Sequence, residues 1–562
     1  MLSVNKRTCL SLTFALLTGS VFAQKDEVPK GWHLMDKASS GFYGISTDKA
    51  YQFVKSKKLK SNTVIVAVID SGIDTLHEDL KQVLWINPKE IPGNGIDDDK
   101  NGYVDDIHGW NFLGGRDGRN VEKDSYEAAR VYHSLKAKYT DKTINEASLS
   151  PAEAEEYKMW LRSKTEVVGD SKESGMELIF MKRAYTNCLK ADSILQKAMG
   201  KEKYTGKELE AFTSDDAAVK KAKNTIFGLM SGNDALEASN TEFLEGFGEY
   251  IEAEESKAEA RNSAPPAYRN DIVKDNYDDF NDRYYGNNDV MVSNKSALHG
   301  THVSGIIAAA RNNNKGMDGV ADNVRIMSLR AVPDGDEHDK DIALSIRYAV
   351  DNGARVINMS FGKSFSPEKK WVDEAVKYAE SKGVLIVHAA GNDAKNLDSS
   401  FNFPTPNLLD GTRPTNWITV GASGDPKAGG LTANFSNYGK KEVDVFAPGV
   451  KIYATVPGGN TYQNLQGTSM ASPVVAGLAA FLMEYFPTLS ARQVKMVIEK
   501  SAKGPGEKVK NPGTDELEGM EELSKTGGII NAYEAVKLAA TIKGERKPAV
   551  KTSSKVSPKK RN

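Results

Sequence analysis

The chain has 562 residues, with 74 Lys or Arg and 76 Asp or Glu, so its formal net charge is −2. This length is too great for one small hydrophobic core, and two or more structural units are expected. The near balance of charge does not point to nucleic acid, which is not expected as a partner. Beyond the N-terminal region, no segment approaches the roughly 20 consecutive apolar residues of a transmembrane helix.

The first 23 residues have the pattern of a secretory signal peptide. Residues 6–7 are basic, residues 10–17 form a short apolar core, and residues 21–23 resemble a small-residue cleavage site. We therefore expect export to the periplasm or the exterior. Cys188 would then be the only cysteine of the mature chain, which excludes an intramolecular disulfide and favours a buried helical residue.

The first regular elements are a helix and a buried strand. Residues 48–55 are predicted to be helical, within a leading arm that spans residues 24–60. Residues 63–69 are β-branched and apolar, which indicates a buried strand. That strand ends on Asp70, so a carboxylate is expected at the end of a strand.

An acidic loop follows, with five aspartates between residues 97 and 106. Alternating oxygen-bearing residues and then Gly102 resemble the start of a calcium loop, although the twelfth position is His108 and excludes an EF-hand. Hard oxygen ligands suit Ca²⁺, and a solvated acidic turn is the alternative. The predicted calcium ligands of this loop are Asp97, Asp99, Asn101, Asp105 and Asp106.

Residues 118–285 are rich in Ala, Glu, Lys and Leu and are predicted to form an α-helical insertion. Capping boxes at residues 150–153 and 205–208 predict two helix starts, and another helix is expected to begin at Met176. We expect four to six helices that pack on one another or on the rest of the protein.

Two further segments place reactive side chains at helix starts. His299 precedes an apolar, Ala-rich run, and His302 is interpreted as a packed histidine rather than as a second base. Ser469 stands where turn residues give way to apolar residues at helical spacing, with Pro473 expected in the first helical turn. Free N–H groups and the helix dipole at that position suit an acyl-transfer nucleophile.

A serine at a helix start is more often an N-cap than a nucleophile. The segments that carry Asp70 and His299 reverse that interpretation. Together with Ser469 they supply the acid, base and nucleophile of a triad. They follow one another in the order Asp, His, Ser, which is one of the known orders of serine proteases.

In these motifs the chain resembles the subtilisin-like serine proteases, or subtilases. The matching segments are DSGID at Asp70, HGTHVSG at His299, GTSMASP at Ser469 and VHAAGN ending at Asn392. The resemblance covers roughly residues 60–115 and 290–540. It implies an α/β fold of three layers, with a mostly parallel sheet flanked by helices, and a catalytic domain over residues 61–117 and 286–540.

The resemblance also implies a role for each matching residue. His299 would take the proton of Ser469, Asp70 would orient His299, and Asn392 with the N–H of Ser469 would hold the oxyanion. Lys363 is expected at the rim of the substrate pocket, together with Asp393. The two walls of the substrate cleft would be Ser360, Phe361 and Gly362 on one side and Ala390 and Gly391 on the other.

Other parts of the chain match the family less directly. Asp79 and Asn313 correspond to ligand positions of a calcium site that many subtilases share, which would be a second site here. Residues 24–60 are too few for the folded propeptide that many subtilases carry, so the means of activation stays open. Residues 541–562 are rich in Lys, Pro and Ser and are predicted to form a disordered basic tail.

The sequence as a whole predicts an exported serine endopeptidase that cleaves polypeptide substrates through an acyl-enzyme, with structural calcium and no organic cofactor. A non-catalytic peptide-binding or chaperone-like module on a protease fold is the main alternative. An esterase or a peptide ligase would use the same intermediate. The cleavage preference and the oligomeric state are left open.

Overall fold

The computed structural model describes residues 28–169, 171–232, 235–236 and 238–546; the predicted signal peptide and the end of the predicted tail lie outside these ranges. A seven-stranded parallel sheet with the order β2-β3-β1-β4-β5-β6-β7 forms its centre. The strands are β1 (Val64–Asp70), β2 (Gly109–Asn111), β3 (Val324–Arg330), β4 (Val356–Met359), β5 (Leu385–Ala389), β6 (Trp417–Ser423) and β7 (Val445–Pro448). Antiparallel pairs are formed by β8 (Ile452–Val456) with β9 (Thr461–Leu465) and by β10 (Val509–Lys510) with β11 (Leu517–Glu518).

Strand β1 illustrates why this sheet needs a layer of helices on each face. Val66 and Val68 belong to the hydrophobic core on one face, whereas Ala67 and Ile69 belong to the core on the other. Successive side chains of a strand point to opposite faces, so a strand that is apolar at every position must be covered on both sides. The prediction of a buried strand ending on Asp70 is confirmed.

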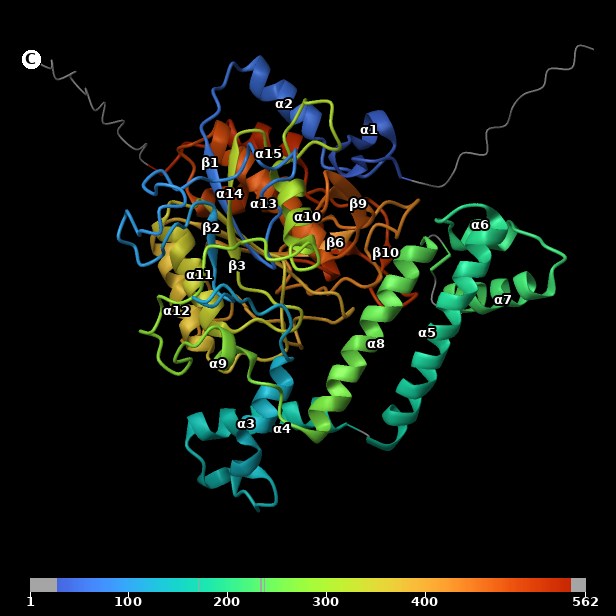
Figure 1. The fold of residues 1–562 in the computed structure, drawn as a ribbon. Helices are drawn as coiled ribbons and strands as arrows, with labels where there is room; N and C mark the ends of the chain where they lie inside the picture. Colours follow the sequence, from blue (N-terminus) through green and yellow to red (C-terminus); the bar gives the residue numbers. More distant parts are fainter. Residues whose placement is uncertain (1–27, 170, 233–234, 237, 547–562) are drawn as a thin grey trace, which may run out of the picture.

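Helices cover both faces of the sheet, which gives the predicted three-layer α/β arrangement (Figure 1). The core that contains Val66 is closed by α10 (Leu298–Ala308), α13 (Thr468–Tyr485), α14 (Ala491–Ser501) and α15 (Ala532–Ala539). The opposite core is closed by α11 (Asp339–Asp351) and α12 (Lys369–Ser381). A short 3₁₀ helix, η3 (Met520–Glu522), precedes α15.

The described part of the N-terminal arm packs on the body of the protein. It contains η1 (Trp32–Leu34), α1 (Lys37–Ser40) and α2 (Thr47–Ser56), and the last of these confirms the helix predicted over residues 48–55. The fully buried Trp32 donates its indole N–H to the carbonyl of Val450 at 3.1 Å. Among the described residues, no helix has the length and apolar character needed to cross a bilayer.

The segment between β2 and α10 is helical, as predicted, but its described part contains seven α-helices rather than four to six. Capping boxes at Ser150 and Thr205 start two of them, as expected. The helices are α3 (Glu127–Tyr139), α4 (Pro151–Val168), α5 (Ser171–Met199), α6 (Gly206–Ala211), α7 (Ala217–Gly232), α8 (Asn240–Asn262) and α9 (Tyr268–Ile272), with the 3₁₀ helix η2 (Glu146–Ser148) between α3 and α4.

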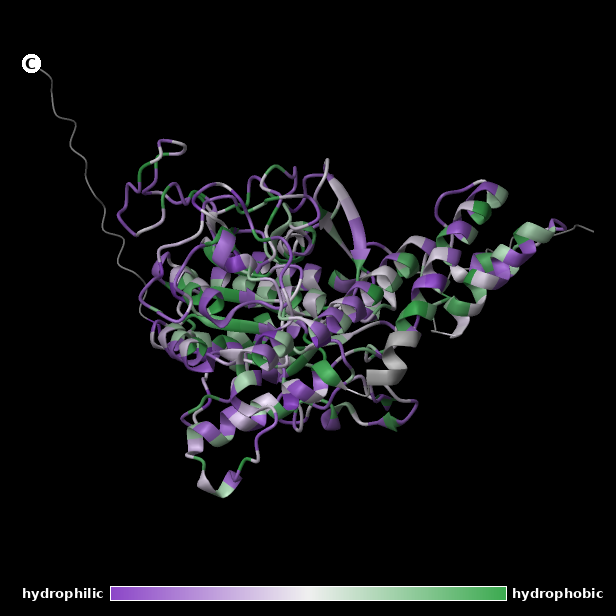
Figure 2. Cartoon of the chain, turned by 60° about the horizontal axis from the view of Figure 1, so that its bottom comes forward, coloured by the Kyte–Doolittle hydropathy of each residue, from purple (hydrophilic) through white to green (hydrophobic). Residues whose placement is uncertain are grey.

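These helices form two separate cores. One joins α3 and α4 and includes Phe365 of the catalytic body, so this part of the insertion is anchored to the body. The other contains the buried Cys188 and side chains of α5, α6, α7 and α8, and it projects away from the body (Figure 1). The hydrophobic colour in Figure 2 lies mainly in the central sheet, whereas the projecting helices alternate between hydrophilic and hydrophobic residues.

Candidate active site

The predicted acid and base meet at the carboxyl edge of the sheet. Asp70 is the last residue of β1, and His299 is the second residue of α10. Their side chains form a hydrogen bond of 2.7 Å between Nδ1 of His299 and Oδ1 of Asp70. The Asp70 side chain is 3% exposed and that of His299 is 36% exposed, so the acid is buried behind an accessible imidazole.

Close approach of helix and strand depends on Gly300. A β-carbon at this position would lie 2.2 Å from the carbonyl oxygen of Gly72 and 3.2 Å from the Asp70 side chain. Any larger residue would therefore push the start of α10 away from Asp70. The neighbouring His302 is buried, contacts the carbonyl of Gln463 at 3.0 Å, and has its pKa lowered to about 3 by burial, which agrees with a packed, neutral histidine.

Ser469 occupies the second position of α13, where its backbone N–H has no partner within the helix. Its hydroxyl donates to the carbonyl of Ser360 at 3.0 Å, and its own carbonyl accepts from the Ser360 hydroxyl at 2.9 Å. Pro473 stands in the second turn and not in the first as predicted, because the helix begins at Thr468. Proline has no N–H, so the carbonyl four residues earlier, that of Ser469, is left for Ser360.

The side chain of Asn392 follows the end of β5 and is oriented by Thr468. Its Oδ1 accepts from the backbone N–H of Thr468 at 2.9 Å and from the Thr468 hydroxyl at 3.0 Å. The amide Nδ2 therefore faces the other way. A β-carbon built on Gly467 would lie 3.4 Å from Nδ2 of Asn392 and 3.6 Å from the N of Ser469. The two predicted oxyanion donors thus lie around one small volume beside Ser469.

Thr468 has a positioning role that the sequence analysis did not assign. It is fully buried, and its hydroxyl also accepts from the backbone N–H of Gly391 at 3.0 Å. This single side chain therefore ties the loop after β5 to the start of α13. The one signal of this role in the sequence was the position of Thr468 directly before the predicted nucleophile.

The two predicted substrate walls follow the ends of β4 and β5. On one wall, the carbonyl of Phe361 contacts Nε2 of the buried His388 at 2.8 Å. The amide of Asn402 lies between the walls, since Nδ2 donates to the carbonyl of Ala390 at 3.0 Å and a β-carbon on Gly362 would be 2.2 Å from Oδ1. Asn402 therefore occupies the gap between the two walls, a role that no sequence motif indicated.

The expectation that Lys363 stands at the pocket rim is wrong. Its side chain is 1% exposed, and its ammonium lies 2.8 Å from a carboxylate oxygen of Glu127 and 2.9 Å from one of Asp339. Burial alone would lower the pKa of Lys363, but these carboxylates raise it above its ordinary value. The insertion supplies Glu127 from α3, so the sequence near Lys363 contained no sign of this partner.

The acidic loop brings together three carboxylates, of which two were predicted. One oxygen each of Glu90, Asp97 and Asp99 lies within 4.8 Å of the others, which fits the oxygen ligands that Ca²⁺ takes. The backbone N–H of Asn101 donates to both aspartates at 3.1 Å. Glu90 was missed because it precedes the loop, and only the fold of residues 90–106 brings it to the cluster.

The other predicted ligands of this loop make different contacts. The Asp105 carboxylate accepts backbone N–H groups of residues 93–95. Asp106 accepts from the Tyr348 hydroxyl at 2.5 Å and from the Asn101 amide at 2.9 Å, and burial raises its pKa to about 6. The structure thus uses Asp105 and Asp106 to hold the loop and to join it to α11.

At the second predicted calcium site, Asp79 and Asn313 are neighbours. The Asn313 amide donates to Oδ1 of Asp79 at 2.5 Å, and the Tyr462 hydroxyl donates to Oδ2 at 2.7 Å. Both oxygens of Asp79 are therefore hydrogen-bonded to protein groups. Beside them the ammonium of Lys315 lies 2.5 Å from Glu78, which places a positive charge near the pair. A lysine also lies beside the cluster around Glu90, where Lys89 is 3.6 Å from Asp99, but there three carboxylates each bring an oxygen within 4.8 Å of the others.

Comparison with known proteins matches residues 61–520 to the Subtilase family. The thermophilic serine proteinase of Bacillus sp. (strain AK1) is 40% identical over 239 residues, which are 42% of this chain and 52% of that protein. Subtilisin DY of Bacillus licheniformis is 40% identical over 212 residues, or 37% of this chain and 72% of that protein. A solved structure from Pseudoalteromonas arctica PAMC 21717, described as one of its proteases, is 28% identical with a TM-score of 0.34, covering 43% of this chain and 70% of that one.

Proposed function

This chain belongs to the subtilase family, and from that premise we propose that it is a serine endopeptidase acting through an acyl-enzyme. The aligned segment spans about half the length of the thermophilic serine proteinase, so the activity of the whole protein is part of the proposal. The observation that carries it is the 2.7 Å pair of Asp70 and His299 at the sheet edge where α13 also presents Ser469.

In the proposed reaction, His299 removes the hydroxyl proton of Ser469 as that oxygen attacks a peptide carbonyl. Asp70 holds the imidazole through Nδ1, which leaves Nε2 to accept the proton, and stabilises the imidazolium that forms. The same proton then passes to the leaving amine. Water attacks the acyl-enzyme in the second half of the cycle, again with His299 as the base.

The negative oxygen of the tetrahedral intermediate would be held by two donors, the side-chain amide of Asn392 and the backbone N–H of Ser469. Their convergence supports this assignment, because preorganised donors stabilise charge that develops during the reaction. The position of Ser469 at the N-terminus of an 18-residue helix adds a favourable dipole.

Labelling with a fluorophosphonate probe tests the nucleophile. We expect the full-length protein to be labelled and Ser469→Ala to remain unlabelled, while Ser472→Ala, altered at a buried serine of the same helix, stays labelled. Labelling that persists in Ser469→Ala would reject the assignment. Absence of labelling in the unaltered protein would favour the non-catalytic binding module.

Endopeptidase action is tested with a polypeptide substrate whose ends are blocked. Internal fragments should appear from an N-acetylated, C-amidated peptide when the full-length protein is present and not with Ser469→Ala. Cleavage restricted to peptides with free termini would contradict the proposal. Release of an ester group without any peptide cleavage would point to an esterase.

We also propose that Glu90, Asp97 and Asp99 hold a structural calcium ion. Their oxygens would bind a hard cation, and a bound ion would stabilise the loop without entering the chemistry. Calcium should raise the melting temperature of the full-length protein, and Glu90→Gln with Asp97→Asn should remove that increase. An equal calcium effect in the double variant would place the ion elsewhere, with Asp79 and Asn313 as the remaining predicted site.

The proposed organisation is an N-terminal arm over residues 24–60, a catalytic domain over 61–117 and 286–540 and an insertion over 118–285. The tail predicted over 541–562 was begun too early, because the carbonyl of Lys543 accepts from the Gln493 amide at 2.9 Å and the N–H of Arg546 donates to the carbonyl of Thr488 at 2.8 Å. Export is proposed from the signal-like residues 1–23, which lie outside the described residues. N-terminal sequencing of the protein secreted by an expression host should then begin at Gln24. A retained Met1 in the exported protein would contradict cleavage at that position.

A further inference from the structure

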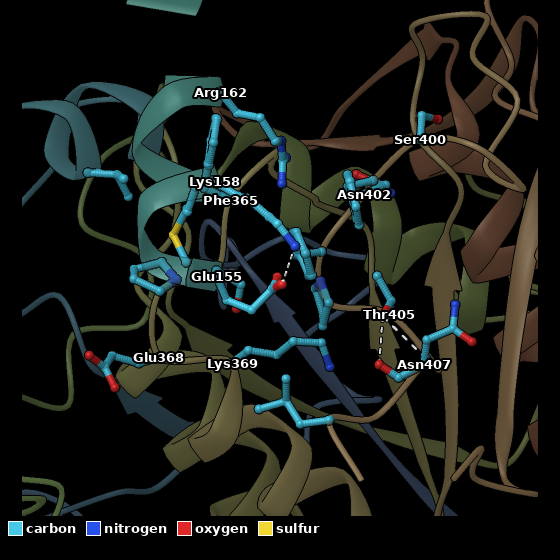
Figure 3. A pocket seen from close by; sticks show the side chains of 18 of the residues that line it. Glu155, Lys158, Arg162, Phe365, Glu368, Lys369, Ser400, Asn402, Thr405 and Asn407 are labelled. Atoms are coloured by element: carbon cyan, nitrogen blue, oxygen red, sulfur yellow. Dashed lines mark hydrogen bonds and ion pairs between the residues drawn. The ribbon is translucent and has the colours of Figure 1, made fainter. Parts of the chain in front are cut away.

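A cavity of about 1040 Å³ lies where the insertion meets the catalytic body, and we call it the junction pocket. Figure 3 shows Glu155, Lys158 and Arg162 extending into it from α4 on one side, with Asn402, Thr405 and Asn407 on the facing loop. Its size is at the upper end of the range for ligand-binding cavities. Neither the triad nor the predicted calcium ligands line it.

A second cavity of about 360 Å³ lies beside the junction pocket. It shares Phe401 and Asn402 with the junction pocket, and its lining includes Gly362 of one substrate wall and Asp393, which follows the oxyanion donor. The two cavities are therefore neighbours. The second cavity thus borders both the junction pocket and one predicted substrate wall.

An exposed aromatic ring stands where the two cavities adjoin. Phe401 is 53% exposed and stacks on Phe403, with ring centroids 5.7 Å apart and planes 8° apart. The guanidinium of Arg162, from α4, lies 4.3 Å from the centre of the Phe401 ring and donates to the carbonyl of Ser364 at 2.8 Å. The ring is thus held in place by both parts of the molecule, and rigid, exposed aromatic rings are typical binding hot spots.

The charges around the junction pocket have both signs. Glu155 and Lys158 pair with each other at 2.8 Å, and Glu368 and Lys369 occur side by side on the body (Figure 3). A mixed rim does not select a ligand by net charge. Apolar contact with Phe365, Phe401 and Phe403, which line the pocket, is then the remaining basis for selecting a ligand.

We propose that the junction pocket is an exosite that binds a large apolar or aromatic side chain of the polypeptide substrate, remote from the scissile bond. The inference rests on the proposed peptidase function, because the occupant is the substrate itself. The neighbouring cavity, which reaches Gly362 of the substrate wall, argues for a polypeptide, and the exposed Phe401 ring argues for an apolar anchor. The insertion then contributes to substrate selection.

The test measures binding of fluorescein-labelled casein to the inactive full-length variant Ser469→Ala by fluorescence anisotropy. Adding Phe401→Ala should raise Kd at least about tenfold. Met159→Gln, which puts an amide into the pocket from α4, should also weaken binding. The matched control is Phe180→Ala, which removes a 64% exposed ring of the insertion outside the pocket and should leave Kd unchanged. Equal Kd values for all variants would overturn the proposal.

A kinetic comparison separates the exosite from damage to the active site. With Ser469 present, Phe401→Ala should raise KM for casein about tenfold and leave the hydrolysis of p-nitrophenyl acetate unchanged, because that ester reaches only the nucleophile. Equal losses on both substrates would overturn the proposal. Failure of fluorophosphonate labelling would instead reject the peptidase function, and the casein-binding result from Ser469→Ala would still be readable.

Discussion

The active-site edge and the junction with the insertion lie next to each other but use charge in opposite ways. At the active site, Asp70 is buried while His299 remains accessible. At the junction, Lys363 and Lys340 have side chains that are 1% and 0% exposed, and each lies within 3 Å of a buried carboxylate. Only two residues of chain separate Ser360, which contacts Ser469, from Lys363.

The difference shows two uses of polar groups in one molecule. Groups that must react keep access to a substrate, and their geometry is held by backbone and helix ends. Groups that must hold two parts together are buried and pair with opposite charges, which makes the contact costly to break. Arg269 of α9 provides a second example, with ion pairs to Asp275 at 2.7 Å and to Asp341 at 2.6 Å.

The largest expected effect comes from breaking the junction. Lys363→Met removes the ammonium and leaves the buried carboxylates of Glu127 and Asp339 without it, which should lower the free energy of unfolding by about 3–5 kcal/mol. Urea unfolding of the full-length protein would measure it. Lys158→Ala is the control, because its pair with Glu155 is largely exposed and should cost less than about 0.5 kcal/mol. Equal losses in the two variants would contradict the comparison.

The next effect concerns catalysis rather than stability. Asn392→Ala should lower kcat about 10²–10³-fold, the loss known for removing one oxyanion donor in a subtilisin, because the oxyanion keeps only the N–H of Ser469. Asn392 is exposed, so the free energy of unfolding of the Asn392→Ala variant should stay close to that of the parent protein. A kcat within threefold of the parent would show that this amide does not serve the transition state. Steady-state kinetics on one peptide substrate decides the matter.

A third prediction concerns pH and the junction. Burial raises the pKa of Glu337 to about 8 beside Lys363, and burial raises that of Asp336 to about 6. A carboxyl group whose pKa is raised on folding stabilises the native state. This stabilisation is complete at pH values below the pKa of the unfolded state and is lost as pH rises through the pKa of the folded state. The parent protein should therefore lose stability between pH 6 and 8, by on the order of 1 kcal/mol.

Glu337→Gln should flatten that part of the profile, since the remaining Asp336 titrates near pH 6. Thermal unfolding from pH 5 to pH 9 would measure both curves. Parallel curves for parent and variant would show that Glu337 does not carry this dependence. Asp339 and Lys363 also face this cluster. The pKa of Lys363 is raised by its carboxylate neighbours, so its charge shifts both curves alike.

The smallest effect should come from Thr468, which orients the oxyanion donor without touching the substrate. Thr468→Val keeps the shape but removes the hydroxyl bond to Oδ1 of Asn392, and we expect kcat to fall about fivefold, or ~1 kcal/mol. KM should hardly change, and Thr468→Ser should restore kcat. A loss in KM alone, or no rescue by serine, would indicate a merely structural role.

Several features could be predicted because their signals are local. A β-branched run identified β1, turn residues followed by helical periodicity identified the start of α13, and capping boxes identified α4 and α6. Each depends on residues within a few positions of one another. The helix count of the insertion was underestimated, because short helices such as α6 and α9 have too few turns for a periodic pattern.

Other features could not be predicted, because they join residues far apart in the chain. Glu90 joins the acidic cluster only through the fold of the loop. Asn402 belongs to a later loop but lies between the two substrate walls. Lys363 was assigned to a rim because it directly follows the predicted substrate wall of residues 360–362. Its partner Glu127 comes from the insertion, and no residue near Lys363 in the sequence indicated this ion pair.

The sequence alone determined the family, the parallel sheet and the three segments that carry Asp70, His299 and Ser469, because these depend on short-range patterns and motifs. The tertiary structure decided which carboxylates gather, how Thr468 orients Asn392, and where the insertion meets the body. Those contacts join segments that are far apart in the chain, so no short stretch of sequence predicts the distances between them. Burial then set their energies, because a charge removed from water is stable only beside a partner that the fold brings to it.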